Sequence, residues 1–163
     1  MKIAFAGNKT TTFECMNKFL DDNLGKIDYL IHVNHEISRK NKISGYMNLN
    51  DFCKRNNIKV ISPSKYDLRS ESDIEKINKL EIDIIFVIGW QRLIPKSILA
   101  SLSIGAFGMH GSPEPLPRGR GRSPLNWSLI NDKKYFITNL FKYDEGVDSG
   151  EIVDSQKFEI NHW

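Results

Sequence analysis

The chain of 163 residues has little of several features that mark specialised classes of protein. It contains two cysteines, Cys15 and Cys53, without the spacing of a metal motif, so we expect both to be reduced thiols in or near the core. No apolar run approaches the ~18 residues of a membrane span. No signal peptide is expected either, because a predicted strand begins at once. These absences favour a cytoplasmic protein with no membrane partner.

The chain also has little net charge. The chain carries 23 Lys and Arg against 20 Asp and Glu, which leaves a formal net charge of +3 and a pI near 8.8. This balance is too mild to predict a nucleic-acid partner, but it suits a small anionic ligand. The chain shows no internal repeat and no low-complexity segment. Its length and its 40% hydrophobic residues predict one folded domain with a sizeable core.

Glycine-rich phosphate motifs are missing after the first predicted strand. Only Gly7 is a glycine in residues 7–12, so the Gly-x-Gly-x-x-Gly fingerprint is absent and NAD is unsupported. A Walker P-loop is absent too. The turn instead offers backbone amides, a lysine and threonine hydroxyls at a helix start, which predicts an anion site at Asn8, Lys9 and Thr10. The alternative is an ordinary turn with a threonine cap.

Strand and helix patterns alternate along the chain. The predicted strands cover residues 2–6, 27–33, 59–62, 82–89 and 106–109, with later strands at 135–142 and 152–160. The predicted helices cover residues 12–23, 50–56, 70–80, 95–102 and 123–130, and residues 34–47 form a predicted loop. The 82–89 run is apolar and β-branched, as in a strand covered on both faces. The pattern predicts an α/β fold: a doubly wound, mostly parallel, Rossmann-like sheet with antiparallel strands at its C-terminal edge.

Proline and glycine gather in residues 110–127. Four of the six prolines and three of the eleven glycines lie there, together with three arginines, behind His110. Proline fixes φ and glycine permits positive φ, so a loop of defined shape is predicted. The strand predicted at 106–109 places His110 at its carboxyl end, where open α/β sheets bind ligands. The alternative is a proline-rich connector with a solvated basic tip.

The motifs, taken in order, resemble those of the folate-dependent formyltransferases. This superfamily comprises the methionyl-tRNA, glycinamide-ribonucleotide and nucleotide-sugar N-formyltransferases. Its Asn-x-His, Leu-Pro, Arg-Gly, Pro and Val/Leu-Asp-x-Gly elements correspond here to Gly108-Met109-His110, Leu116-Pro117, Arg120-Gly121, Pro124 and Val147-Asp148-Ser149-Gly150. The resemblance spans essentially all 163 residues, and the sequence of residues 119–127 is most similar to the nucleotide-sugar branch.

The resemblance implies transfer of a formyl group from N10-formyltetrahydrofolate, a co-substrate, to the amino group of an amino-sugar nucleotide, without a metal. It implies that residues 1–163 are a single catalytic domain that lacks a C-terminal region, through which a homodimer would form. One alternative is the catalytic domain of a methionyl-tRNA formyltransferase. The other is a folate- or nucleotide-binding module that has lost catalysis.

The resemblance also implies which residues form the site. His110 would stabilise an oxyanion or shuttle a proton, and Asp148 would orient its ring. The family's asparagine is Gly108 here, so Asn126 is the candidate replacement donor, although it could equally be a helix-surface residue. The folate-binding candidates are Trp90, Arg92, Leu93, Ile94, Tyr143, Asp144, Glu145, Gly146 and Val147, of which Trp90 and Leu93 could equally be core residues. The candidates for binding substrate phosphates are Asn8, Lys9, Thr10, Arg118 and Arg120. The alternative for the two arginines is that they are solvated or pair with local carboxylates.

Overall fold

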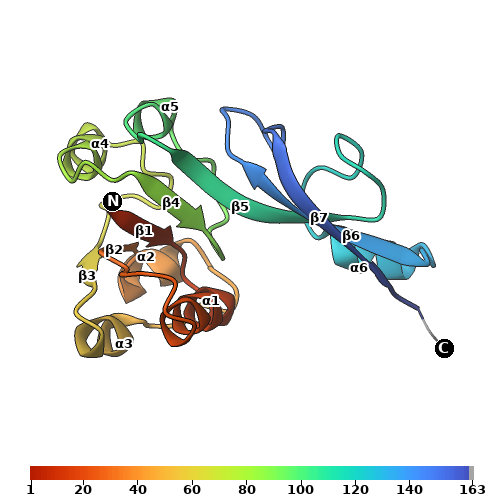
Figure 1. Ribbon diagram of the computed structural model, residues 1–163, viewed down its shortest axis with the longest axis horizontal. Coiled ribbons are helices and arrows are strands. Elements are labelled where there is room, and N and C mark those ends of the chain that lie inside the picture. The colour runs from red at the N-terminus through yellow and green to blue at the C-terminus, as the bar shows by residue number, and fades with distance from the viewer. Residues whose placement is uncertain (162–163) are drawn as a thin grey trace. The chain divides into compact units, whose positions relative to one another are not determined.

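The computed structural model describes residues 1–161, which divide into two compact units (Figure 1). The first unit covers residues 1–106 and the second begins at residue 107.

The first unit is an alternating arrangement of strands and helices. Its strands are β1 (Ile3–Ala6), β2 (Tyr29–Ile31), β3 (Lys59–Ile61) and β4 (Ile84–Val87). Its helices are α1 (Thr10–Asp21), α2 (His35–Lys40), α3 (Asn50–Arg55), α4 (Glu71–Asn78) and α5 (Lys96–Leu99). Strand β1 pairs in parallel with β2 and β4, and β2 pairs in parallel with β3. The carboxyl ends of these four strands therefore share one edge, as the predicted doubly wound sheet requires.

Periodic apolar residues place the core where the sequence predicts it. Met16 on α1 and Leu30 on β2 are fully buried, and Phe13, Phe19 and Leu20 pack partly buried against the same cluster. These α1 residues share one helix face because they recur at helical spacing. Cys53 is buried in this core. Cys15 is exposed, so the prediction of a near-core thiol was wrong for it: its position on α1 points away from the Met16 face.

Helix α2 lies within residues 34–47, which were predicted to be a loop. The Asn34 side chain caps this helix by accepting a hydrogen bond from the Ile37 amide at 2.8 Å. Periodicity could not reveal the helix, because it has six residues and Ile37 is the one aliphatic side chain among them. Helix α3 begins at Asn50, the residue at which the sequence predicts the 50–56 helix to start, and ends at Arg55.

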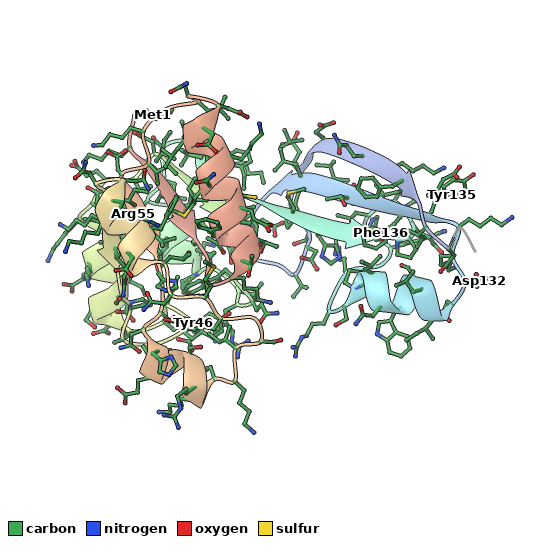
Figure 2. The ribbon with its side chains drawn as sticks, turned by 90° about the horizontal axis from the view of Figure 1, so that it is seen from below. Met1, Tyr46, Arg55, Asp132, Tyr135 and Phe136 are labelled. Carbon is green, nitrogen blue, oxygen red and sulfur yellow. The ribbon has the colours of Figure 1, made fainter. Side chains whose placement is uncertain are left out.

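The second unit is an antiparallel arrangement that begins within β5. Its elements are β5 (Gly105–Ser112), α6 (Pro124–Ile130), β6 (Tyr135–Lys142) and β7 (Ile152–Glu159). Strand β6 pairs antiparallel with both β5 and β7, which confirms the antiparallel C-terminal strands. The full strand order is β3-β2-β1-β4-β5-β6-β7. Pro124 begins α6, within the helix predicted at residues 123–130, and Figure 2 shows Asp132 in the turn that joins α6 to β6 and Tyr135 at the start of β6.

Strand β5 is longer than predicted, which changes the setting of His110. The prediction ended the strand at residue 109, whereas β5 runs to Ser112 and places His110 inside it. Hydrogen bonding to β6 extends β5 through residues that carry little strand propensity of their own, Gly108 and Gly111 among them. A Cβ on Gly111 would lie 2.3 Å from the ring of Phe136, so this close packing requires glycine.

Within residues 1–161, no helix has both the length and the apolar character needed to cross a membrane.

A buried carboxylate holds the connection between β3 and α4. Asp73 is 4% exposed, and its carboxylate accepts hydrogen bonds from the amides of Ser64 and Lys65 at 2.8 and 3.1 Å and from Ser64 Oγ at 2.8 Å. Ser70 caps α4 by accepting from the Asp73 amide at 3.2 Å. Burial alone would raise the pKa of Asp73, but hydrogen bonds from Ser70, Ser64 and Lys65 lower it below its ordinary value.

This arrangement predicts a pH-dependent contribution to stability. Asp73→Asn should lower the free energy of unfolding by about 1–3 kcal/mol at pH 7, because charge-assisted hydrogen bonds are lost. Since the folded-state pKa is depressed, the wild-type advantage exists above the unfolded value of about 3.9 and disappears as the pH falls through the folded-state pKa. Urea unfolding at pH 7 and pH 3 measures it, with Glu14→Gln on α1 as the control. An equal difference at both pH values would contradict the assignment.

Candidate active site

The second unit brings His110 and Asp148 together. His110 Nδ1 lies 3.5 Å from Asp148 Oδ2, and the two side chains are 10% and 20% exposed. His110 stands on β5, whereas Asp148 lies in the loop between β6 and β7 with φ of 47°, a left-handed conformation in which Asp is enriched. The Gly121 amide donates to the same Asp148 oxygen at 2.9 Å. The carboxylate therefore links the imidazole to the 110–127 loop.

The other nitrogen of His110 also faces an oxygen of this loop. Its Nε2 lies 3.0 Å from the carbonyl oxygen of Gly119. Both partners of the ring, Gly119 O and Asp148 Oδ2, are acceptors, so only a doubly protonated ring donates to both and a neutral ring serves one. A group that reaches Nε2 must displace the Gly119 carbonyl.

Hydrogen bonds within the 110–127 loop give it the defined shape that its proline and glycine content predicts. Ser112 Oγ donates to the Arg118 carbonyl at 2.9 Å and accepts from the Glu114 amide at 3.2 Å. Gly119 has φ of +75°, and a Cβ there would lie 2.0 Å from Ser112 Oγ. Glycine at this position therefore allows the chain to turn and point its carbonyl at His110.

Asn139, which the sequence analysis missed, holds the backbone of His110. Asn139 on β6 lies directly opposite His110 and is 1% exposed. Its Nδ2 donates to the His110 carbonyl at 3.3 Å, and its Oδ1 accepts from Ser155 Oγ at 2.7 Å. The signal was an asparagine in the middle of a strand pattern, where asparagine is depleted.

The remaining candidates of the 110–127 loop lie on its surface. Asn126 is exposed on α6, and within residues 1–161 its side chain makes no hydrogen bond to His110 or Asp148. Arg120 is exposed, and Arg118 is exposed with its Nη1 3.4 Å from Glu114 Oε2. The structure therefore joins His110 with Asp148 and leaves these three side chains accessible.

The 143–147 segment leads into the Asp148 turn. Tyr143 stacks on Phe141 with ring centroids 5.0 Å apart, and burial raises the pKa of Tyr143 to about 12, with a further contribution from the Asp148 charge. Asp144 accepts hydrogen bonds from Ser149 Oγ and the Gly146 amide. Those two bonds lower the pKa of Asp144. Glu145 and Val147 are exposed, so the segment is an ordered turn with an accessible outer side.

The turn after β1 is fixed by its neighbours. Asn8 is fully buried, its Oδ1 accepts from the Val33 amide at 2.9 Å, and its carbonyl accepts from Met47 at 2.9 Å. Asn8 thus positions the turn, whereas Lys9 is half-buried and Thr10 is exposed. Thr12 is one of the threonines of the 7–12 turn. Its Oγ1 accepts a hydrogen bond from the Lys9 amide at 3.2 Å and donates one to the carbonyl of Ile88 at 2.6 Å.

The loop after β4 contains both buried and accessible residues. Trp90 is 7% exposed and packs edge-on against Tyr66 at 4.8 Å, and Ile94 is buried. Trp90 Nε1 is buried and has no hydrogen-bond partner within residues 1–161. Leu93 is 39% exposed, and the Arg92 guanidinium lies 4.8 Å from the Tyr66 ring centroid. Leu93 and Arg92 are therefore available to a ligand, and the Trp90 indole has an unused donor.

Among the described residues, no three His, Cys, Asp or Glu side chains are grouped so that they could hold a metal ion.

The structure is an α/β fold in which a histidine and an aspartate side chain lie 3.5 Å apart, and solved structures share this fold. Glycinamide ribonucleotide transformylase 1 from Geobacillus kaustophilus matches with a TM-score of 0.76 and 17% identity, over 99% of this chain and 84% of that chain. An N-formyltransferase from Helicobacter canadensis, in complex with folinic acid and dTDP-3-aminofucose, matches with a TM-score of 0.69 and 22% identity, over 99% and 54%. Identities this low show the fold alone.

Residues 1–162 match the family model described as formyl transferase, and the chain belongs to this family. A methionyl-tRNA formyltransferase of Clostridioides difficile (strain 630) is 32% identical over 162 residues, which are 99% of this chain and 50% of the relative. One from Prochlorococcus marinus (strain MIT 9215) is 30% identical over 154 residues, 87% and 45%. The chain spans about half the length of these curated relatives. The resemblance to the formyltransferase superfamily is confirmed. The branch of the superfamily to which the chain belongs is a proposal.

Proposed function

We propose that the protein transfers a formyl group from N10-formyltetrahydrofolate to the amino group of an amino-sugar nucleotide. The observation that carries the proposal is the 3.5 Å approach of His110 and Asp148 in a chain of the formyl transferase family. Both residues lie in segments, Gly108-Met109-His110 and Val147-Asp148-Ser149-Gly150, that resemble motifs of this family.

The pair supplies what formylation of an amine requires. Attack by the amine places negative charge on the formyl oxygen and leaves an extra proton on nitrogen. Breaking of the bond between the formyl carbon and N10 then restores the carbonyl, and the departing N10 requires a proton. A protonated His110 stabilises that negative charge, and a neutral His110 accepts the proton. Asp148 holds the ring and stabilises its positive form. The Gly121 amide holds Asp148 in turn, so the carboxylate keeps its orientation while the ring changes its protonation state.

The loop after β4 has a composition that fits a folate. When bound, N10-formyltetrahydrofolate supplies the formyl group and presents a flat heteroaromatic ring with polar edges. The partly exposed Leu93 offers apolar surface to such a ring, and the buried Trp90 Nε1 is a donor without a partner among residues 1–161. An unpaired buried donor is costly, and a ligand acceptor would satisfy it. The resemblance to the family supports Tyr143, Asp144, Glu145, Gly146 and Val147 as further proposed folate contacts.

Basic side chains are proposed to bind the phosphates of the amine substrate. Lys9 and Thr10 border the turn after β1, where Asn8 fixes the backbone, and Arg118 and Arg120 extend from the 110–127 loop. The ion pair of Arg118 with Glu114 is exposed, so a ligand phosphate can replace it at little cost. The net charge of +3 favours a small nucleotide, because tRNA binding draws on many phosphate contacts.

A second candidate function is formylation of methionyl-tRNA, because the curated relatives reported above carry that name. Single-turnover formyl transfer from monoglutamyl N10-formyltetrahydrofolate separates the two. We expect transfer to at least one member of a panel of amino-sugar nucleotides and none to charged initiator tRNA. Transfer to the tRNA alone would establish the second candidate. No transfer to either acceptor, with folate binding retained, would identify a binding module.

Removal of either member of the pair should reduce transfer without unfolding the protein. His110→Ala should lower kcat by about 10²–10⁴-fold, the usual contribution of a general acid–base group. Asp148→Asn keeps the shape of the side chain and should lower kcat while altering the pH–rate profile. His35→Ala, an exposed histidine on α2, is the control and should retain wild-type kcat. Transfer by His110→Ala within tenfold of wild type would remove His110 from the mechanism.

Asn126 is proposed as the amide donor that replaces the family asparagine at Gly108. Its exposure leaves its amide free for a substrate oxygen, whereas the Asn139 amide is already committed to the His110 carbonyl. Asn126→Ala should lower kcat by ~10²-fold with little change in substrate binding, as for loss of an oxyanion donor. Asn131→Ala, at the other end of α6, is the control. A wild-type rate in Asn126→Ala would show that a backbone amide or water is the donor.

A further inference from the structure

His32 is a buried titratable side chain that the proposed mechanism does not use. It follows β2 directly and is 1% exposed. Burial lowers the pKa of its imidazole below the ordinary value, although the hydrogen bond with Gly7 opposes this shift. The ring is therefore neutral at pH 7, with one nitrogen that donates a hydrogen bond and one that accepts.

The partners of the ring determine which nitrogen carries the proton. Nδ1 of His32 lies 3.0 Å from the carbonyl oxygen of Gly7, which can only accept, so Nδ1 carries the proton and donates it. Nε2 is then the acceptor, and Tyr46 Oη lies 3.4 Å from it and 3.3 Å from the Val33 carbonyl. The His32 and Tyr46 rings also stack, with centroids 5.5 Å apart and planes inclined by 16°. His32 thus contacts the turn after β1 on one side and the segment before α3 on the other.

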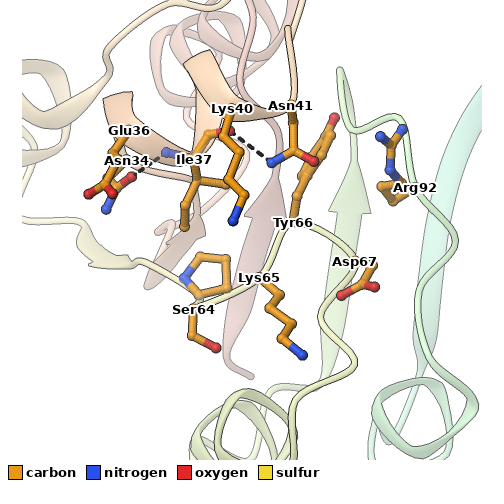
Figure 3. A pocket seen from close by; sticks show the side chains of 11 residues that line it. Asn34, Glu36, Ile37, Lys40, Asn41, Ser64, Lys65, Tyr66, Asp67 and Arg92 are labelled. Carbon is orange, nitrogen blue, oxygen red and sulfur yellow. Dashed lines mark hydrogen bonds between the residues drawn. The ribbon is translucent and has the colours of Figure 1, made fainter.

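Helix α2 returns the chain from β2 so that Tyr46 reaches His32. Its first turn is capped by Asn34, whose Oδ1 accepts from the Ile37 amide at 2.8 Å. At its other end, Asn41 Nδ2 donates to the Ile37 carbonyl at 2.9 Å, and Figure 3 draws both bonds as dashed lines. The stacked pair is therefore supported by a helix with both ends fixed.

These contacts hold consecutive peptide groups of the turn after β1. The imidazole binds the Gly7 carbonyl, and the Asn8 carbonyl accepts from the Met47 amide at 2.9 Å. Lys9 pairs with Tyr46 in an isolated antiparallel bridge. Because a peptide group is planar and trans, a fixed carbonyl fixes the direction of the next amide. The amides of Asn8 and Lys9 therefore have a set direction where α1 begins.

We propose that His32 is a positioning residue for the amine substrate, which holds the turn after β1 in the geometry that binds the substrate phosphates. The inference rests on the proposed function, in which Lys9 and Thr10 contact those phosphates. Anion binding at a helix start depends on the direction of its backbone amides, so rotation of the peptide group after Gly7 weakens it. His32 itself contacts no reacting atom in this role.

Calorimetry with dTDP and UDP as nucleotide probes, and with 5-formyltetrahydrofolate as the folate probe, tests the role of His32. His32→Phe keeps an aromatic ring against Tyr46 but cannot donate to Gly7. It should weaken binding of the nucleoside diphosphates about tenfold and leave the folate affinity within about twofold of wild type. In formyl transfer, the KM for the amine substrate should rise while kcat changes by less than about twofold, as for loss of uniform binding.

Two polar variants separate the hydrogen bond with Gly7 from the packing of the ring. His32→Asn places an amide N–H near the position of Nδ1 and should restore most of the diphosphate affinity. His32→Gln places its amide near the position of Nε2 and should not restore it. Nitrogen NMR of the wild-type imidazole should show the neutral ring at pH 7 with its proton on Nδ1.

Ile61→Val on β3 is the control for reduced packing. Ile61 is buried and its carbonyl accepts from the His32 amide at 3.0 Å, but its side chain has no polar atom, so the variant should keep the wild-type diphosphate affinity. A folded His32→Phe with wild-type diphosphate affinity would overturn the inference. Where His32→Phe does not fold, equal affinities of His32→Asn and His32→Gln would overturn it.

Failure of the inference is distinguishable from failure of the proposed function. A wild-type protein that binds neither diphosphate would overturn the role of His32. Formyl transfer to a member of the amino-sugar nucleotide panel would still support the proposed function in that case. Absence of both diphosphate binding and transfer would overturn both.

Discussion

Parallel pairing of β1 with β2 and β4 is the constraint on which the first unit depends. The pairing places the carboxyl ends of four strands on one edge, so the segments after β1, β2, β3 and β4 gather there. Each of these segments carries polar or charged side chains, from Lys9 to Arg92. None of them is near another in sequence. The four segments lie at one edge of the sheet because the strands run in the same direction. Backbone hydrogen bonding between the strands sets that direction.

Buried polar groups then convert this edge into defined surfaces. Asn8 uses its side chain to join the turn after β1 to Val33, and Asp73 joins the segment after β3 to α4. The side chains of Asn8 and Asp73 are both buried, so neither is accessible to a ligand. Their contribution is positional, because a buried side-chain oxygen that accepts hydrogen bonds from backbone amides admits few alternative backbone arrangements.

In the second unit the corresponding constraint is the contact of the 110–127 loop with the histidine–aspartate pair. The loop touches His110 through the Gly119 carbonyl and Asp148 through the Gly121 amide. Two glycines with positive φ therefore connect a proline-rich loop to an imidazole on β5 and a carboxylate beyond β6. Asn139 secures the opposite side of β5 through the His110 carbonyl. The imidazole is thus held between the Gly119 carbonyl and the Asp148 carboxylate, and the Asn139 amide holds the backbone of His110.

Local pattern sufficed for the elements that bury a periodic apolar face. The α1 face around Met16, the apolar β4 strand, and the capped α4 helix all follow from residue spacing, because burial of such faces stabilises the elements that carry them. The pattern failed for α2, which is stabilised by its Asn34 cap rather than by an apolar stripe. It also failed for the end of β5, where pairing with β6 overrides the weak propensity of its glycines.

The amino-acid sequence by itself determined the fold class, the family, and the identity of His110 and Asp148 as candidates, since these depend on residue types and their order. Tertiary structure alone decided that the two lie 3.5 Å apart, that Asn139 supports one of them, and that His32 contacts both Gly7 and Tyr46. The reason is that spacing along a chain determines which side chains share a helix or strand face. Contacts between distant segments depend instead on strand direction and register, which arise when the backbone hydrogen bonds of the whole sheet form.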